Sequence, residues 1–403
     1  MSQLSAAPVP AWSGDGGVPA FYTWTGAIPV KPGIFLRGEA LSSEMSLPDA
    51  GIALRILYTS TGWPKAKPIT VSGALFIPKG TPPKGGWPLI AWSHGTTGYA
   101  DVCAPSARPR SERDAKYLND WLKDGYAIVA TDYAGLGTPG PHPYLQYKSE
   151  GMSVLDSIRA VQAKFPELSR DVLTMGQSQG SGAALGAALI APDYAPELEI
   201  KGTVATGIVA ATTAIGNAPQ VKDAEIYTSP KDYSNTAYEV LFFLGTVRAS
   251  NPDQIKPDDY ISKRGWPMLE NAQHSCFRDL AKDAQTMKIS VADFYKRPID
   301  NLEAIADKTR NFPNVHIKTP VFIGTGLADT SAKTSKQYNF VSAMCAAGTT
   351  VQWHYYPHAT HSSALPRARV DSPTFVKTVM QGKRAENMCA KLVPPGPIQT
   401  PEE

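Results

Sequence analysis

One serine of this chain stands in a pattern that could turn its hydroxyl into a nucleophile. Ser178 lies at the centre of Gly176-Gln-Ser-Gln-Gly180, which has the GxSxG form. An apolar run comes directly before this pattern and a run of glycine and alanine follows it. The serine is therefore expected at a tight strand-to-helix turn that exposes its side chain. A phosphate-binding loop would require GK[ST], which does not follow here. We predict a catalytic Ser178, and an ordinary glycine-rich turn is the alternative.

A serine hydroxyl becomes a nucleophile when a base takes its proton and an acid orients that base. Where the serine occupies such a turn, the acid and then the base follow it along the chain. Asp329 comes just past a predicted strand over 319–323 and is the predicted acid; capping the next helix is its alternative role. His361, in the loop after the last predicted strand, is the predicted base. We favour it over His358, which follows that strand immediately.

Attack on a carbonyl carbon produces a negatively charged oxygen, which needs preorganised N–H donors. The backbone N–H of Gln179, the residue after the serine, is one predicted donor. Thr96, in the loop Ser93-His-Gly-Thr-Thr-Gly98, is the other, with Thr97 as the next choice. The alternative for this loop is a turn selected for flexibility. Asp132 ends a strand at the same edge, and we expect it to be a buried structural residue.

The elements that would position these residues alternate between strands and helices. Strands are predicted over 52–60, 69–78, 87–92, 126–131, 171–175, 200–210, 319–324 and 351–356, and helices over 116–123, 153–164, 182–190 and 331–346. Such alternation is typical of an α/β protein with a mostly parallel, doubly wound sheet. We assign 51–210 and 316–392 to this core.

The alternation stops between 211 and 315, where no strand is predicted. Helical patterns occur there over 236–244, 267–283, 291–295 and 301–309. A helical block between two sheet strands is an insertion, which we expect to form a cap or lid over the carboxyl edge of the sheet. Residues 1–50 are rich in proline, glycine and serine and are expected to form an arm around the core; 393–403 is expected to be a flexible tail.

Composition excludes several other classes of function. The 39 basic and 36 acidic residues nearly balance, so neither nucleic acid nor a membrane surface is implied as a partner. No apolar run reaches the length of a membrane-spanning helix. The opening Met1–Pro10 lacks the features of a signal peptide and is similar to the start of a mature exported protein. The four cysteines form no CxxC pair, so zinc is not expected, and we predict no cofactor.

Together these residues resemble the secretory lipase family, the branch of α/β-hydrolases that includes fungal lipase A-type enzymes. The similar pieces are Ser93-His-Gly-Thr-Thr-Gly98, Cys103-Ala-Pro-Ser106, Asp132-Tyr-Ala-Gly-Leu-Gly137, His142-Pro-Tyr144, Gly176-Gln-Ser-Gln-Gly180, Gly326-Leu-Ala-Asp329 and Tyr356-Pro-His-Ala-Thr-His361. The resemblance implies the α/β-hydrolase fold and places the nucleophile, acid and base on Ser178, Asp329 and His361. It also implies a helical lid and a disulfide from Cys103 towards Cys276.

We expect two disulfides, Cys103–Cys276 and Cys345–Cys389, the second from its placement near the chain's end. Four buried free thiols in a cytosolic enzyme are the alternative. Because disulfides persist in oxidising compartments, we expect a secreted or periplasmic protein, with a cytoplasmic one as the alternative.

The predicted function is carboxylic ester hydrolysis through an acyl-enzyme, on small-molecule esters with short-to-medium acyl or aromatic groups. The insertion has one pronounced apolar stretch, 238–244, among many charges, which disfavours interfacial activation on long-chain fat. A lipase, an acyltransferase, or an amidase or peptidase with the same triad are the enzymatic alternatives. A hydrolase-like binding protein without activity is the alternative outside enzymes.

Overall fold

The computed structural model describes residues 12–222 and 233–402. The opening Met1–Pro10, part of the predicted arm, residues 223–232 of the predicted insertion and residue 403 lie outside this description.

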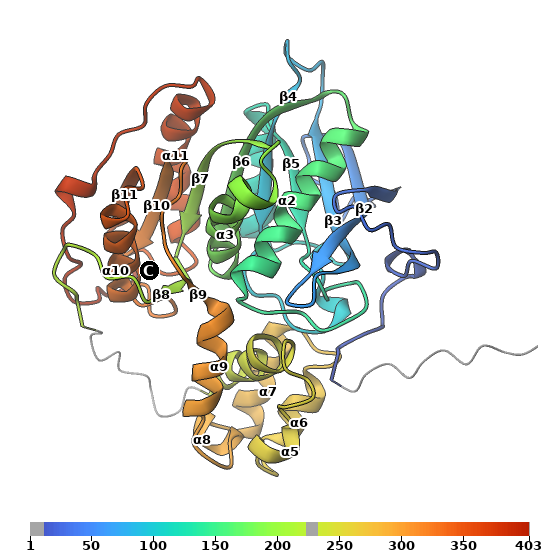
Figure 1. Ribbon diagram of the computed structural model, residues 1–403, viewed down its shortest axis with the longest axis vertical. Helices are drawn as coiled ribbons and strands as arrows, with labels where there is room; N and C mark the ends of the chain where they lie inside the picture. Colours follow the sequence, from blue (N-terminus) through green and yellow to red (C-terminus); the bar gives the residue numbers. More distant parts are fainter. Residues whose placement is uncertain (1–11, 223–232, 403) are drawn as a thin grey trace, which may run out of the picture.

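A nine-stranded sheet forms the centre of the described chain, in the order β1-β2-β3-β5-β4-β6-β7-β10-β11 (Figure 1). Its strands are β1 (Phe35–Ala40), β2 (Ala50–Gly62), β3 (Lys67–Pro78), β4 (Trp87–Ser93), β5 (Ala127–Thr131), β6 (Leu168–Gln177), β7 (Glu199–Thr206), β10 (Val321–Gly326) and β11 (Val351–Tyr356). The pairs β1–β2, β2–β3 and β3–β5 are antiparallel, and the neighbours from β5 to β11 are parallel. The predicted α/β-hydrolase sheet is confirmed.

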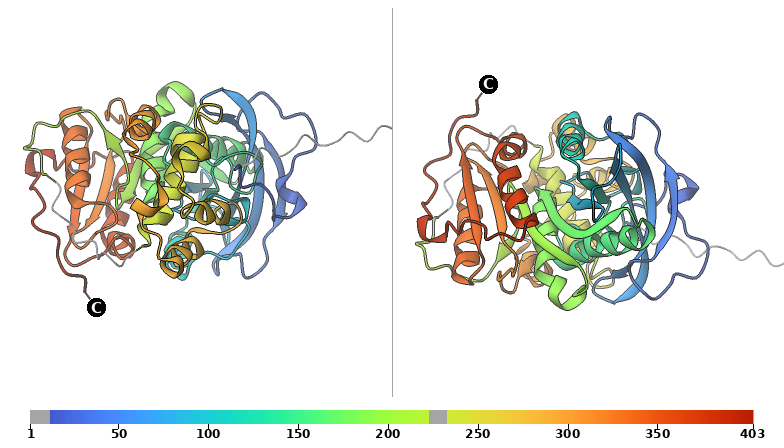
Figure 2. Two further views of the ribbon diagram at one scale, coloured as in Figure 1. Left: turned by 90° about the horizontal axis from the view of Figure 1, so that it is seen from below. Right: turned by 90° about the horizontal axis from the view of Figure 1, so that it is seen from above.

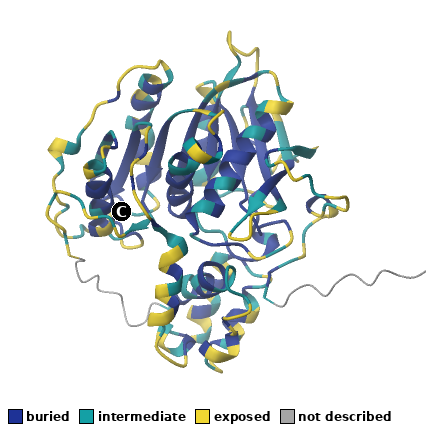
Figure 3. Cartoon of the chain, viewed as in Figure 1, coloured by how far each residue is buried: buried dark blue, intermediate teal, exposed yellow. Residues whose placement is uncertain are grey.

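Helices cover both faces of the sheet (Figure 1). They are α1 (Glu112–Lys123), α2 (Tyr147–Lys164), α3 (Gln179–Tyr194), α10 (Thr334–Ala346) and α11 (Ala364–Met380), with short 3-10 turns η1 (Ala20–Tyr22), η2 (Asp101–Cys103) and η4 (Cys389–Lys391). Because successive strand residues point to opposite faces, Leu89 and Ala91 of β4 pack with α2 and α3, whereas Ile90 and Trp92 pack with α1 and α11. Figure 3 shows that these layers bury most of the sheet.

Several features of the fold differ from the predictions. β1 lies within the region expected to be only an arm, and it pairs with β2 at the sheet's edge. α11 was not predicted because Pro373 stands inside it, and an internal proline normally breaks a helical pattern. Two-residue strands, β8 (Ala211–Thr212) and β9 (Asn311–Phe312), pair at the two ends of the insertion, where no strand was expected. A two-residue strand is too short to show the alternating apolar pattern from which a strand is predicted.

The insertion between β7 and β10 consists of helices with a core of their own. They are α4 (Asn235–Leu241), the π-helical η3 (Phe242–Arg248), α5 (Pro257–Tyr260), α6 (Trp266–Asn271), α7 (Phe277–Met287), α8 (Val291–Phe294) and α9 (Asp300–Arg310). The single helical stretch predicted over 267–283 is two helices, because α6 ends at Asn271 and α7 begins only at Phe277. Figure 1 shows these helices, yellow to orange, gathered at one end of the sheet, and in the left view of Figure 2 they lie in front of it. No helix within the described ranges is long and apolar enough to cross a membrane.

Both ends of the described chain are bonded to the rest of the molecule. The Gly14 N–H donates to Gln273 Oε1 at 3.0 Å, so the arm reaches the insertion. The final residues were expected to be loosely held, yet the Gln399 N–H donates to Leu327 O at 2.9 Å and the Glu402 N–H donates to His358 O at 3.2 Å. Backbone hydrogen bonds of this kind order a segment that its composition would leave free.

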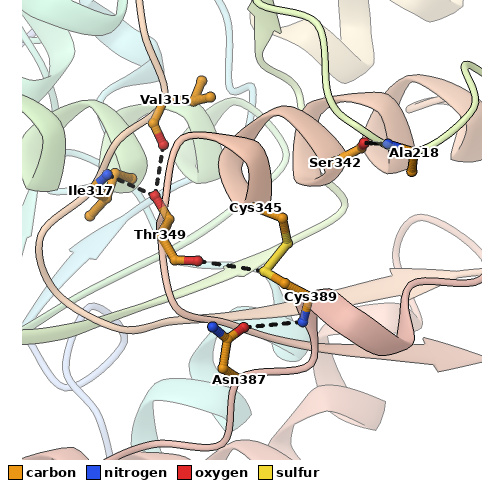
Figure 4. Close-up of a disulfide and its surroundings, with 8 residues drawn as sticks. All are labelled: Ala218, Val315, Ile317, Ser342, Cys345, Thr349, Asn387 and Cys389. Atoms are coloured by element: carbon orange, nitrogen blue, oxygen red, sulfur yellow. Dashed lines mark hydrogen bonds between the residues drawn. A yellow bond between two sulfur atoms is a disulfide. The ribbon is translucent and has the colours of Figure 1, made fainter.

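All four cysteines are paired as predicted, Cys103 with Cys276 and Cys345 with Cys389. The second disulfide joins α10 to the 3-10 turn η4 near the end of the chain (Figure 4). Beside it, Thr349 Oγ1 donates to Val315 O at 2.8 Å, which ties the loop before β10 to the turn after α10. The disulfide therefore lies in a connected region at the outer end of the sheet.

Candidate active site

Ser178 is the first residue after β6 and immediately precedes α3. Its φ of 58° and ψ of −126° place it in a conformation that non-glycine residues rarely adopt. The flanking glycines are required by packing, because a Cβ at Gly176 would overlap the carbonyl oxygen of Gly180, and one at Gly180 would overlap that of Ser93. The GxSxG pattern thus folds as a sharp turn with Ser178 at its apex.

Asp329 and His361 are hydrogen bonded to each other. His361 Nδ1 lies 2.8 Å from Asp329 Oδ2, and the Asp329 side chain is fully buried. Asp329 Oδ1 accepts from the N–H groups of Ser331 at 2.9 Å and Ala332 at 2.8 Å. Gln337 Nε2 donates to Oδ2 at 3.2 Å. These donors hold the carboxylate with one oxygen towards the imidazole. The predicted alternative, an N-cap of the next helix, is not what the structure has, since α10 begins at Thr334 with Lys333 as its N-cap.

The His361 ring packs against a glycine, Gly207, that was not among the predicted site residues. Gly207, just after β7, has a φ of 54°, and a Cβ there would lie 2.9 Å from both Nδ1 and Cε1 of His361. On its other side, Gln177 Nε2 donates to the His361 carbonyl at 3.1 Å. A glycine directly after a buried strand was the only signal for this contact. His358 lies elsewhere, with its Nδ1 2.9 Å from Thr400 O.

Ser178 and His361 both line one cavity of about 770 Å³. Its wall includes the loop with Thr96 and Thr97 and residues of the insertion, among them Tyr238 of α4 and Phe277 of α7. Gly95 lies close to the serine, because a Cβ built there would be 3.5 Å from Ser178 Cβ. The described structure therefore brings the predicted nucleophile, base and oxyanion loop to one cavity.

The loop carrying Thr96 and Thr97 is also joined to the insertion. The Phe277 N–H donates to Thr97 O at 2.8 Å, and Gly98 forms an isolated antiparallel bridge with Cys276. The disulfide from Cys276 to Cys103 lies at the same place. Three connections thus hold this loop against the start of α7.

Gln179, the residue after the serine, has its side chain in a buried polar cluster. Its Nε2 donates to Glu150 Oε1 at 2.7 Å and to His142 Nε2, which lies 3.0 Å away. Burial lowers the pKa of His142 to about 3, so the ring is neutral. Its Nδ1–H donates to Ala134 O at 3.0 Å, which leaves Nε2 as the acceptor. Burial raises the pKa of Glu150 to about 8. Sequence reasoning missed Glu150, which no short motif marks.

Asp132 has the structural role expected of it. Its carboxylate accepts from Ser72 Oγ at 2.7 Å, from the Ser106 hydroxyl, and from the Ser106 N–H at 2.9 Å. Burial raises the pKa of this carboxyl group. These bonds connect β3, the residue that follows β5 and the loop after η2. No group of three or more potential metal ligands occurs in residues 12–222 and 233–402.

Sequence comparison shows which known proteins this chain is similar to. A sequence profile of the secretory lipase family matches residues 110–228, and one of the prolyl oligopeptidase family matches residues 274–377. Lipase A of Moesziomyces aphidis is 24% identical over 402 residues, which cover 93% of this chain and 82% of that protein.

Solved structures agree with this fold. The closed state of Candida antarctica lipase A matches with a TM-score of 0.72 at 20% identity, covering 95% of this chain and 91% of that one. A ligand-bound form of the rice cell wall degrading esterase LipA from Xanthomonas oryzae matches with a TM-score of 0.61 at 17% identity, covering 88% of this chain and all of that one. At these identities the structural matches establish the fold alone. The profile and the sequence match over 93% of this chain support a lipase A-like family, and the chain is a carboxylic ester hydrolase.

Proposed function

We propose that Ser178, His361 and Asp329 form a catalytic triad that cleaves carboxylic esters through an acyl-enzyme. The observation that carries this proposal is the 2.8 Å contact between His361 and the buried Asp329, in a cavity that also exposes Ser178. With Nδ1–H donated to Asp329, the other ring nitrogen is left unprotonated and can act as a base. This is the arrangement by which a histidine activates a serine hydroxyl.

In the first half of the reaction His361 Nε2 takes the Ser178 proton while Oγ attacks the ester carbonyl. The tetrahedral oxyanion is held by the backbone N–H groups of Gln179 and Thr96. The C–O bond to the alcohol then breaks, and the alcohol leaves with the proton from His361. In the second half His361 takes a proton from water, the hydroxide attacks the acyl carbon, and the acid leaves as Ser178 regains its proton.

We propose that the insertion, 211–315, acts as a cap over the cavity and that the substrates are esters with short-to-medium acyl or aromatic groups. Tyr238 and Phe277 supply aromatic surface to the cavity wall. Much of the apolar stretch 238–244 is packed inside the insertion, because Leu241, Phe243 and Leu244 are fully buried in its core. Long-chain fat at an interface is therefore disfavoured as the substrate.

Amide hydrolysis is the second candidate, favoured by the match to the prolyl oligopeptidase profile. That match covers Asp329 and His361 but does not include Ser178. Acid and base alone are common to esterases and peptidases of this fold, so the match leaves the leaving group open. The secretory lipase profile includes Ser178, which is why we propose ester hydrolysis first. The two disulfides support a secreted or periplasmic location.

The test compares Ser178→Ala with a matched control, Ser169→Ala, a serine of β6 outside the cavity. The parent and both variants are assayed on p-nitrophenyl butyrate and on the matching p-nitroanilide, with and without added alcohol. The melting temperature of each is also measured. We expect Ser178→Ala to lose ester hydrolysis and fluorophosphonate labelling while its melting temperature stays near that of the parent. Retained hydrolysis in this variant would refute the proposed nucleophile. Faster anilide cleavage by the parent would favour the amidase, and ester exchange with alcohol the acyltransferase.

A further inference from the structure

The segment His142-Pro-Tyr144 has no part in the triad, yet both proposed oxyanion donors are bonded to it. Tyr144 OH lies 3.0 Å from Thr96 Oγ1, and His142 Nε2 lies 3.0 Å from Gln179 Nε2. Thr96 follows β4 and Gln179 begins α3, so the two donors belong to different elements. Among the side-chain hydrogen bonds of the described residues, this short segment is the only neighbour that the two donors share.

The segment is itself rigidly held. The Tyr144 N–H donates to His142 O at 2.9 Å, and the Leu145 N–H donates to Glu150 Oε1 at 3.0 Å. That same Glu150 oxygen accepts from Gln179. His142, Tyr144 and Glu150 are all buried. Buried polar networks whose members are bonded to one another restrict the geometry of each member.

The opposite side of the segment is bonded to η3 of the insertion. Thr246 Oγ1 donates to Tyr144 O at 2.9 Å, and Gln146 Nε2 donates to Gly245 O at 3.0 Å. Gly245 is required for this approach, since a Cβ there would lie 2.7 Å from His142 O. The segment thus lies between the insertion and the oxyanion loop, in contact with both.

We propose that His142 and Tyr144 are positioning residues, which fix the two oxyanion N–H groups by holding the side chains of Gln179 and Thr96. This inference rests on the proposed function, since it takes those two residues as the donors. An oxyanion donor is effective only when it is preorganised at the position the charge will occupy. A Thr96 side chain released from Tyr144 lets its own backbone N–H turn away from that position. The loss therefore appears in the chemical step and not in the binding of the neutral ester.

A double-mutant cycle of Tyr144→Phe and Thr96→Val tests this proposal. Each change removes one hydroxyl of the pair and keeps the backbone N–H of residue 96. We expect each single variant to lower kcat on p-nitrophenyl butyrate about tenfold, below the hundredfold or more expected when a donor is deleted outright. KM should stay within about twofold, and the double variant should lose no more than either single one, because the two changes break the same contact. Thr96→Ser, which returns a hydroxyl, should recover most of the lost kcat.

The matched control is Tyr295→Phe. Tyr295 is a buried tyrosine of the insertion whose hydroxyl donates to Glu239 Oε2 at 3.2 Å, away from the segment. It should lower the melting temperature as much as Tyr144→Phe while keeping the parent kcat. A trifluoromethyl ketone, which forms a tetrahedral oxyanion on the serine, should bind Tyr144→Phe more weakly by the same factor as the loss of kcat.

Four results would overturn the inference: an unchanged kcat in Tyr144→Phe, multiplicative losses in the double variant, a raised KM at constant kcat, or undiminished ketone affinity. None of these bears on the triad, which is tested separately by Ser178→Ala and Asp329→Asn. Failure of the inference and failure of the proposed function are therefore separate observations.

Discussion

His361 Nδ1 lies 2.8 Å from Asp329 Oδ2 although the two residues are 32 positions apart. The carboxylate is completely buried and is also held by two backbone N–H groups, from Ser331 and Ala332. This contact decides which nitrogen of His361 carries the proton. Activity should therefore be very sensitive to a substitution of Asp329 that keeps the shape of the side chain and removes its charge.

Asp329→Asn is expected to lower kcat on a neutral ester by about a thousandfold or more, because the amide NH₂ would favour the wrong tautomer of His361. The change is isosteric, so the melting temperature should fall by only a few degrees. Steady-state kinetics near neutral pH measures the effect. A variant with more than a tenth of the parent kcat would show that Asp329 does not orient the base.

Gly207→Ala should lower both activity and stability, because its Cβ would lie 2.9 Å from the His361 ring at a φ of 54°. The matched control is Gly382→Ala, whose φ is 67° but whose Cβ would meet nothing within 4 Å. Both changes carry the backbone strain of about 1–2 kcal/mol, and only the first displaces the imidazole. We expect a similar loss of stability from both and a loss of kcat from Gly207→Ala alone. Equal kcat in the two variants would contradict the contact.

Glu150→Gln should change how stability depends on pH. Burial raises the pKa of Glu150 to about 8 from its ordinary value of 4.5. The native state therefore keeps a proton that the unfolded chain releases above pH 4.5. This group contributes stability that is fully present below pH 4.5 and is lost as pH rises towards 8. The groups that face it are the neutral His142 and Gln179, and the hydroxyls of Tyr133 and Tyr144, whose pKa values are also raised.

Melting temperatures of the parent and Glu150→Gln between pH 5 and pH 8 measure this effect. The parent should lose stability relative to the variant as pH rises, since glutamine keeps the neutral form at every pH. Asp101 and Asp156, whose pKa values burial raises to about 7 and about 6, contribute equally to both curves and cancel. Parallel curves would show that Glu150 does not titrate in this range.

Removing the Cys103–Cys276 disulfide by a double change to serine should cost both stability and activity. It joins residues with a sequence separation of 173, for which the chain-entropy model gives about 5 kcal/mol. It also fixes the loop of Thr96 against α7, so kcat should fall several-fold. The matched control is the Cys345–Cys389 pair, whose serine variants should lose stability and keep kcat, because that disulfide lies outside the cavity. Equal kcat in the two double variants would show that the Cys103–Cys276 disulfide does not position the loop that carries Thr96.

The elements of the fold that have strong local patterns could be predicted from the amino-acid sequence. Apolar runs such as 87–92 and 126–131 became central strands because a sheet covered on both faces needs apolar residues along its length. The pattern around Ser178 was informative for the same local reason, since its glycines are required by contacts within the turn. Where the local signal was short or contradictory, as at β8, β9 and the proline-containing α11, the sequence did not reveal the element.

Contacts between side chains far apart in the sequence became known only from the tertiary structure. His358 and His361 are three residues apart, and the backbone path after β11 sends one to the tail and the other to Asp329. The roles of Gly207, Tyr144 and Glu150 could not be read from the chain, because each depends on a contact across tens of residues. A sequence specifies such contacts through the packing of the whole core, and no local pattern records them.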